Sequence, residues 1–145
     1  MSRLVALDHG TRRIGVAVGD TETAMAFVRP AIQRRSLAID VDTISMIVRD
    51  EEAQMVLLGL PFNMDGSEGP QASAVRDFGR RLEAAGLKVA YADERLTSWQ
   101  AAELMADEGR RARRRSGELD SAAARLILQE YLDALPESNL SSEPE

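Results

Sequence analysis

Acidic residues lie where the sequence pattern changes from one expected secondary-structure element to the next. Asp8 directly follows the apolar run 4–7, Asp93 and Glu94 follow the run 87–92, and Asp120 begins the apolar stripe of the last expected helix. A carboxylate at the end of a buried strand loses hydration, and a hydrogen bond, a proton or a metal ion must offset that loss. Carboxylates that cluster also repel one another unless cations neutralise them. Acids that the fold brings together from these places would form a site for metal ions.

The kind of metal ion follows from the ligand types present. The chain has no cysteine and a single histidine, which excludes thiolate and histidine-rich sites. Carboxylate oxygens favour Mg²⁺ or Mn²⁺. Two such ions about 3.5–4 Å apart activate a water molecule and stabilise the leaving oxygen of a phosphodiester. We therefore predict a hydrolase that uses two Mg²⁺ or Mn²⁺ ions.

Each acid also has a plainer interpretation. Asp8 could cap the turn that follows it, and Asp120 could stabilise a helix N-terminus through the helix dipole. Glu94 could be solvated, and Asp93 is an equal candidate by spacing alone. His9 is expected to be a solvated side chain rather than a ligand or a base.

Arginines are the residues expected to bind a nucleic-acid backbone. The net charge of −6 argues against binding through overall basicity, but a local basic patch can bind phosphate on an acidic protein. Arg12 and Arg13 lie in the turn between the first two expected strands. A dense cluster comprises Arg110, Arg111, Arg113, Arg114 and Arg115. The alternative for both groups is an ordinary solvated turn or loop.

The elements that must position these residues follow from hydrophobic periodicity. The runs 4–7 and 14–18 flank a glycine-bearing turn and predict a buried hairpin. Pro30, in a third strand over 26–35, indicates a sheet edge or a bulge. The other expected elements are a helix within 36–53 capped by Asp40 or Asp42, a strand 54–60, a loop 61–70, a helix from Pro70 that stops at Gly86, a strand 87–92, a helix 98–108, a basic loop 109–117 and a helix 118–135.

This order of elements predicts an α/β fold with a mixed five-stranded sheet, three antiparallel strands followed by two parallel ones, and helices on both faces. At 145 residues we expect one domain over 1–135, followed by a disordered acidic tail over 136–145. There is no apolar run of about 18 residues and no signal-peptide pattern. We therefore expect a cytoplasmic protein without membrane contact.

Four segments, in order, resemble the YqgF (RuvX) family of ribonuclease H-like nucleases. They are VALDHGTRRIGVAVGD, LLGLPFNMDGSEGPQA, YADERLTS and LDSAAARLILQEYL, within a similarity that runs from about Arg3 to Leu135. The resemblance implies a ribonuclease H-like, Holliday-junction-resolvase-like fold. For bacterial members it also implies maturation of the 5′ end of 16S ribosomal RNA from its precursor. The three catalytic acids of the family match Asp8, Glu94 and Asp120.

The expected partners are thus structured or precursor ribosomal RNA and ribosomal precursor particles, with the chain as a monomer or a homodimer. Cleavage of branched DNA, as by a Holliday junction resolvase, is the nearest rival, since both substrates offer the metal ions the same phosphodiester. A non-catalytic nucleic-acid-binding module is a further alternative, against which retention of all three acids argues. The first hairpin also resembles the phosphate-binding start of actin-like ATPases, but those proteins clamp nucleotide between two such domains.

Overall fold

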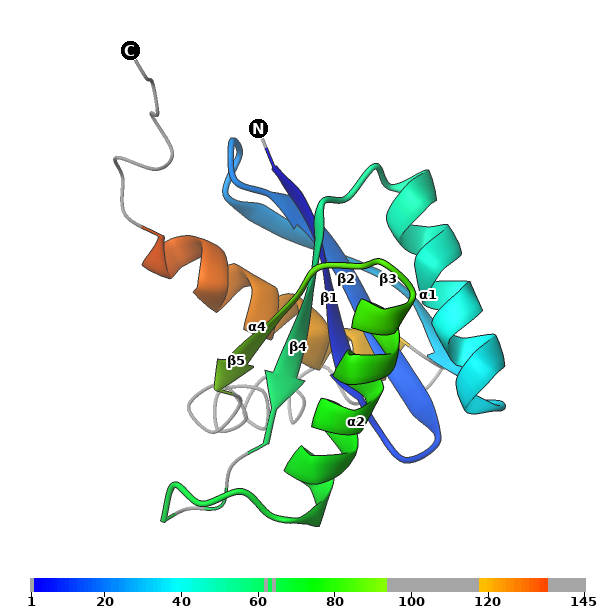
Figure 1. The fold of residues 1–145 in the computed structure, drawn as a ribbon. Helices are drawn as coiled ribbons and strands as arrows, with labels where there is room; N and C mark the ends of the chain where they lie inside the picture. The colour runs from blue at the N-terminus through cyan, green and yellow to red at the C-terminus, as the bar shows by residue number, and fades with distance from the viewer. Residues whose placement is uncertain (1, 62, 64, 94–117, 136–145) are drawn as a thin grey trace.

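The computed structural model describes residues 2–61, 63, 65–93 and 118–135, and for residues 93 and 118–120 it describes the backbone alone. Figure 1 shows one sheet with helices packed on both of its faces. The elements are β1 (Arg3–His9), β2 (Arg13–Asp20), β3 (Met25–Gln33), α1 (Leu37–Asp50), β4 (Met55–Leu60), α2 (Pro70–Ala84), β5 (Val89–Asp93) and α4 (Glu118–Ala134). The expected helix 98–108, the basic loop 109–117 and the tail 136–145 lie outside the described residues.

The sheet confirms the predicted topology. Its strand order is β3-β2-β1-β4-β5, so β1 is central. The pairs β1–β2 and β2–β3 are antiparallel, whereas β1–β4 and β4–β5 are parallel. In the described part of the chain, no helix is both long enough and apolar enough to cross a membrane.

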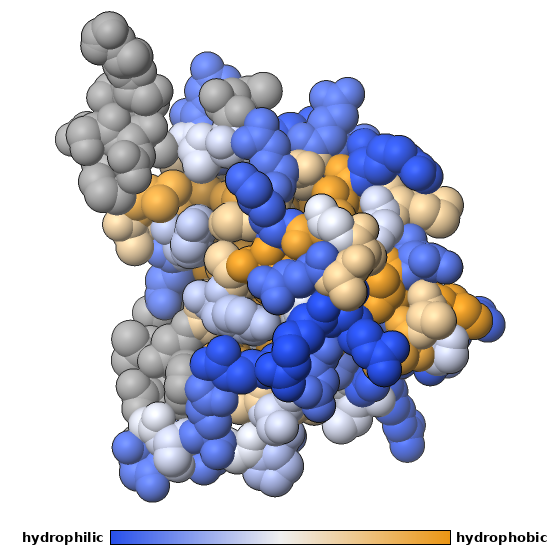
Figure 2. All heavy atoms as spheres, in the orientation of Figure 1, coloured by the Kyte–Doolittle hydropathy of each residue, from blue (hydrophilic) through white to orange (hydrophobic). Residues whose placement is uncertain are grey.

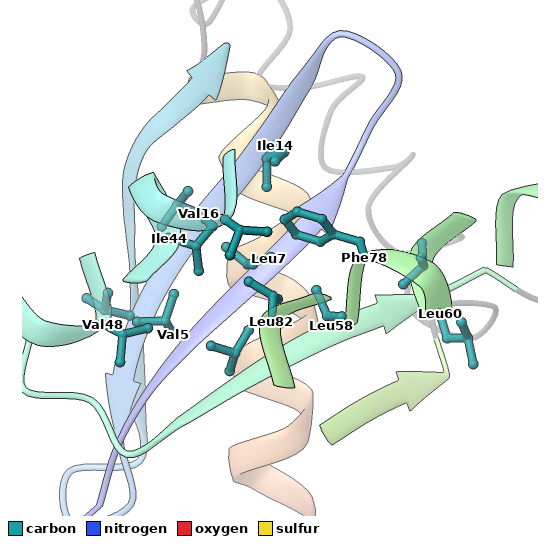
Figure 3. Close-up of a cluster of buried hydrophobic side chains, with 14 of the residues drawn as sticks. Val5, Leu7, Ile14, Val16, Ile44, Val48, Leu58, Leu60, Phe78 and Leu82 are labelled. Carbon is teal, nitrogen blue, oxygen red and sulfur yellow. The ribbon is translucent and has the colours of Figure 1, made fainter. Parts of the chain in front are cut away.

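Both faces of the sheet are buried because successive side chains of β1 point to opposite sides. Val5 and Leu7 join one core layer with α1 and α2, and Figure 3 shows side chains from these elements meeting there. Leu4 and Ala6 join the other layer, against α4. Asp8 continues the alternation of Leu4 and Ala6, as predicted from the sequence.

Few large apolar side chains are exposed among the residues that the structure describes. Figure 2 shows apolar patches among polar ones over α1, where Ile39 and Met46 are 49% and 52% exposed. Met25 and Phe27 of β3 are similarly exposed. Scattered apolar residues of this kind are normal on a folded protein.

The N-cap of α1 differs from the prediction. Ser36, not Asp40 or Asp42, caps the helix, and its side chain accepts a hydrogen bond from the N–H of Ile39. A cap needs an extended backbone just before the helix, and Ser36 has φ −89° and ψ 159°. Asp40 lies inside the first turn instead, where it is buried and accepts a hydrogen bond from the N–H of Arg35 at 3.0 Å.

Pro30 marks both features that the sequence indicated. β3 is an edge strand of the sheet, and its register with β2 shifts where Ile14 pairs with Ile32 but Val16 pairs with Arg29. Pro30 and Ala31 therefore lie opposite the single residue Gly15, which is the two-against-one count of a β-bulge. This bulge interrupts the ladder between β2 and β3, and the side chain of Ser121 from α4 hydrogen-bonds to both strands there.

Candidate active site

Asp8 lies near the C-terminal end of the central strand, in a position fixed by backbone pairing on both sides. It is half-buried and pairs with Gly15 of β2. On the other side, the parallel pairing of Leu7 with Leu58 holds β1 against β4. A side chain at the end of a strand paired on both sides has little freedom to move, so this carboxylate has the rigid backbone that a metal ligand requires.

The first turn of α4 is anchored beside this strand end by a buried serine. The hydroxyl of Ser121 accepts a hydrogen bond from the N–H of Val16 at 3.1 Å and donates one to the carbonyl of Arg29 at 2.6 Å. Val16 follows Gly15, the pairing partner of Asp8. The backbone of Asp120, which precedes Ser121, therefore enters α4 next to the part of β2 that pairs with Asp8. The side chain of Asp120 is outside what the structure describes.

The end of β5 lies at the same edge of the sheet. Its last residue, Asp93, pairs with Leu60, and Tyr91 pairs with Leu58 of β4. Parallel strands end at a common edge, so β1, β4 and β5 all finish there. Glu94 follows Asp93 in the sequence and lies outside the described residues. Among the side chains that the structure describes, no three acids or histidines gather as a metal site, so the three-acid site stays a prediction.

A pocket of about 320 Å³ opens beside Asp8. The residues that line it come from the end of β1, the β1–β2 turn, the segments after β3 and β4, and the start of α2. They are Asp8, His9, Gly10, Thr11, Arg34, Pro61, Gln71 and Ala74. The pocket thus combines one carboxylate, one guanidinium, one imidazole and one side-chain amide.

His9 is half-buried rather than solvated, which corrects the expectation from the sequence. Its ring packs on Phe78 of α2, with ring centroids 4.8 Å apart. Burial, together with the positive charge of Arg34, lowers the pKa of His9 to about 4, although Asp40 acts in the opposite direction. His9 is therefore neutral near pH 7.

The β1–β2 turn places Arg12 and Arg13 at the same edge of the sheet. Both are exposed, and with Gly10 and Thr11 they line a second hollow of about 380 Å³. The turn closes through a hydrogen bond from the N–H of Gly10 to the carbonyl of Arg13 at 2.9 Å. A Cβ at Gly10 would lie 2.7 Å from that oxygen, so the turn requires glycine. The cluster Arg110 to Arg115 falls in the part of the chain that the structure does not describe.

The loop after β4 is held by its own hydrogen bonds. Asn63 donates from its N–H to the carbonyl of Ser67 at 2.8 Å, and from its amide to the Ser67 hydroxyl at 3.0 Å. Asp65 in turn accepts hydrogen bonds from the N–H and the hydroxyl of Ser67. Hydrogen bonds therefore link the described residues 63, 65 and 67 of the turn-rich loop that the sequence predicts at this strand end. The loop begins with Pro61 in the wall of the pocket.

Two residues of the site could not be singled out from the sequence. Arg34 looks the same as its neighbour Arg35 in the sequence, yet only Arg34 lines the pocket beside Asp8. Ser121 does carry a weak signal, because it is a polar residue at the start of an otherwise apolar helix stripe. Its partners, Val16 and Arg29, are 105 and 92 residues away in the sequence.

The sheet order, with a carboxylate near the end of the central strand, defines an α/β domain with a ribonuclease H-like fold. Several solved structures share this fold. The structure of T. thermophilus RuvC in complex with Holliday junction substrate matches with a TM-score of 0.58 and 15% identity, over 92% of this chain and 95% of that chain. The yeast mitochondrial Holliday junction resolvase Ydc2 matches with a TM-score of 0.56 and 10% identity, over 90% of this chain and 78% of that chain.

The chain belongs to the RuvX family, whose model, described as Holliday junction resolvase, matches residues 2–134. A relative from Syntrophus aciditrophicus is 40% identical over 97% of this chain and 95% of its own length. Relatives from Synechococcus elongatus and Moorella thermoacetica are 44% and 42% identical, over 89% and 95% of this chain and 87% and 99% of their own lengths. All three carry the name "Putative pre-16S rRNA nuclease".

Proposed function

We propose that this chain is a nuclease that hydrolyses phosphodiester bonds during maturation of the 5′ end of 16S ribosomal RNA. The observation that carries the proposal is the position of Asp8, near the end of the central strand, where β5 ends and α4 is anchored over β2. The names of relatives that are 40–44% identical over most of the chain support the choice of substrate. The nuclease domain comprises residues 1–135, with 136–145 as an acidic tail, and it acts in the cytoplasm on ribosomal precursor particles.

Asp8, Glu94 and Asp120 are the proposed ligands of two Mg²⁺ or Mn²⁺ ions. The oxygen of Asp8 suits these hard cations, and its half-buried place in a pocket leaves room for waters that complete the coordination. When bound, such ions lower the pKa of a water molecule and stabilise the charge on the leaving oxygen. The protein contributes positioning: paired strands hold Asp8, and the Ser121 hydroxyl holds the helix turn that carries Asp120.

Arginines supply the proposed contacts to the rest of the nucleic acid. Arg12 and Arg13 are exposed in the turn next to Asp8, where a guanidinium can bind a phosphate oxygen. We place the loop that contains Arg110, Arg111, Arg113, Arg114 and Arg115 in the same role. Such contacts orient a strand without reading its sequence.

Cleavage of branched DNA is the second candidate function. The description of the family model favours it. The chemistry at phosphorus is the same for RNA and DNA, whereas a contact to the 2′-hydroxyl would distinguish them. A direct comparison of the two substrates is therefore the decisive measurement.

The test is a cleavage assay on precursor 16S ribosomal RNA and on a four-way DNA junction, each with Mg²⁺, Mn²⁺ or a chelator. Asp8→Asn keeps the size of the side chain but removes the charge that holds an ion. Asp42→Asn, at an exposed position of α1, is the matched control. We expect cleavage of the RNA by the unaltered chain and by the control, and none by Asp8→Asn or with the chelator. Cleavage that survives both chelation and Asp8→Asn would refute the metal mechanism, and cleavage of the junction alone would favour the second function.

A further inference from the structure

Arg34 is held rigidly at the mouth of the pocket beside Asp8. The backbone N–H of Arg34 donates a hydrogen bond to the carbonyl of Arg12 at 2.9 Å. Its Nη1 donates to the carbonyl of Gly10 at 2.9 Å and, less closely, to that of Thr11 at 3.3 Å. Backbone and side chain are therefore both tied to the β1–β2 turn, and the guanidinium has one defined place in the wall of the pocket.

Three of the five N–H donors of this guanidinium have no partner among the described residues. Within the described part of the chain, Nε and Nη2 of Arg34 have no hydrogen-bond partner, and no carboxylate forms an ion pair with it. Other arginines of the fold are neutralised: Arg29 pairs with Glu51, and Arg76 pairs with Glu68. A half-buried guanidinium with unused N–H donors can bind an anion that enters the pocket.

The chemistry of the pocket points to a phosphate as that anion. Among the described residues that line the pocket, Arg34 is the one arginine or lysine and Asp8 the one acid. The free edge of a guanidinium matches two oxygens of a phosphate. A polynucleotide cut at Asp8 carries further phosphates at regular intervals on both sides of the cleaved bond. The pocket adjoins Asp8, so the strand would bring such a phosphate to Arg34.

We propose that the Arg34 guanidinium binds a backbone phosphate of the substrate strand next to the phosphate that is cleaved at Asp8. The inference rests on the proposed function of the site and adds a residue that neither the sequence pattern nor the family match assigns. Arg34 also clamps the β1–β2 turn, so the test must separate phosphate binding from a purely structural role.

The test measures binding without cleavage, on an Asp8→Asn background, by fluorescence anisotropy of a labelled single-stranded fragment of precursor 16S ribosomal RNA over a range of salt concentrations. One phosphate contact on a single strand contributes about 0.7 to the slope of log affinity against log salt. We expect Arg34→Gln to reduce the slope by about 0.7 and Arg34→Lys to keep it. Arg35→Gln is the matched control, because this exposed neighbour does not line the pocket, and it should leave the slope nearly unchanged.

An equal effect of Arg34→Gln and Arg35→Gln on the slope would overturn the role of Arg34, while RNA binding by the Asp8→Asn chain would still stand. Absence of any RNA binding by that chain would overturn the proposed function as well. A structural role alone would lower the melting temperature in Arg34→Gln with the slope intact. If Arg34→Gln does not fold, the test uses modification of arginines by phenylglyoxal in the Asp8→Asn chain. We expect bound RNA to slow the modification of Arg34. An unchanged rate of modification of Arg34 in the presence of RNA would contradict the proposal.

Discussion

The hydroxyl of Ser121 accepts a hydrogen bond from the backbone N–H of Val16, at 3.1 Å and across 105 residues of sequence. The bulge at Pro30 and Ala31 interrupts the ladder between β2 and β3, and the hydroxyl bridges the gap by also donating to the carbonyl of Arg29. Ser121 is fully buried. One hydroxyl therefore satisfies two backbone groups of the sheet and fixes the start of α4 close to the strand end that carries Asp8.

Ser121→Ala should destabilise the fold. The substitution leaves the N–H of Val16 and the carbonyl of Arg29 without their partner, and each buried unpaired group costs about 1–3 kcal/mol. We expect a loss of at least about 2 kcal/mol in the free energy of unfolding, measured by urea denaturation. Ser73→Ala, at an exposed position of α2, should change it by less than about 0.5 kcal/mol. Equal effects of the two substitutions would show that the bridge contributes nothing.

Gly10→Ala should affect both stability and cleavage. A Cβ at this position would lie 2.7 Å from the carbonyl oxygen of Arg13, and that oxygen is backbone and cannot rotate away. The turn must shift, at about 1–3 kcal/mol, and Asp8 lies two residues away. We expect a lower melting temperature and a lower rate of RNA cleavage, whereas Thr11→Ala in the same exposed turn should retain both. If Gly10→Ala leaves the melting temperature and the cleavage rate unaltered, the short distance between position 10 and the carbonyl of Arg13 does not constrain the turn.

His9 should make the fold less stable in mild acid. Burial and Arg34 lower its pKa to about 4 in the folded chain, against about 6.5 in the unfolded chain. Between these values the unfolded state binds the proton more strongly, so the stability present above about pH 6.5 is lost as the pH falls towards 4. His9 is the only histidine, so no other imidazole contributes to this loss of stability. The urea midpoint of the unaltered chain should change more between about pH 7 and pH 5 than the urea midpoint of His9→Gln. An equal change in both chains would show that His9 does not cause the loss of stability.

The arginine cluster should govern the salt dependence of RNA binding. If Arg113, Arg114 and Arg115 each contact one phosphate of a single strand, replacing all three with alanine should reduce the slope of log affinity against log salt by about 2. Fluorescence anisotropy on the Asp8→Asn background measures this slope. Replacing Arg80, Arg81 and Arg49, which lie on α2 and α1, removes the same charge and should change it far less. An unaltered slope in the Arg113, Arg114 and Arg115 variant would exclude the cluster from binding.

Much of the fold was predictable because its causes are local. The alternation of Leu4 to Asp8 defines a strand with two buried faces, and Pro30 indicates the edge and the bulge that the structure contains. Of the predicted catalytic acids, the structure describes the side chain of Asp8 alone, at the end of the central strand. Glu94 and Asp120 remain predictions from the family resemblance.

The described helices and strands, the mixed sheet and the place of Asp8 follow from the sequence, because backbone geometry sets a period of two or of 3.6 residues within each segment. Which side chains meet depends on the tertiary structure. It packs His9 on Phe78 and places Arg34, not Arg35, beside Asp8. It also joins Ser121 to Val16. These contacts depend on strand register and helix packing, which bring together residues that no local pattern relates.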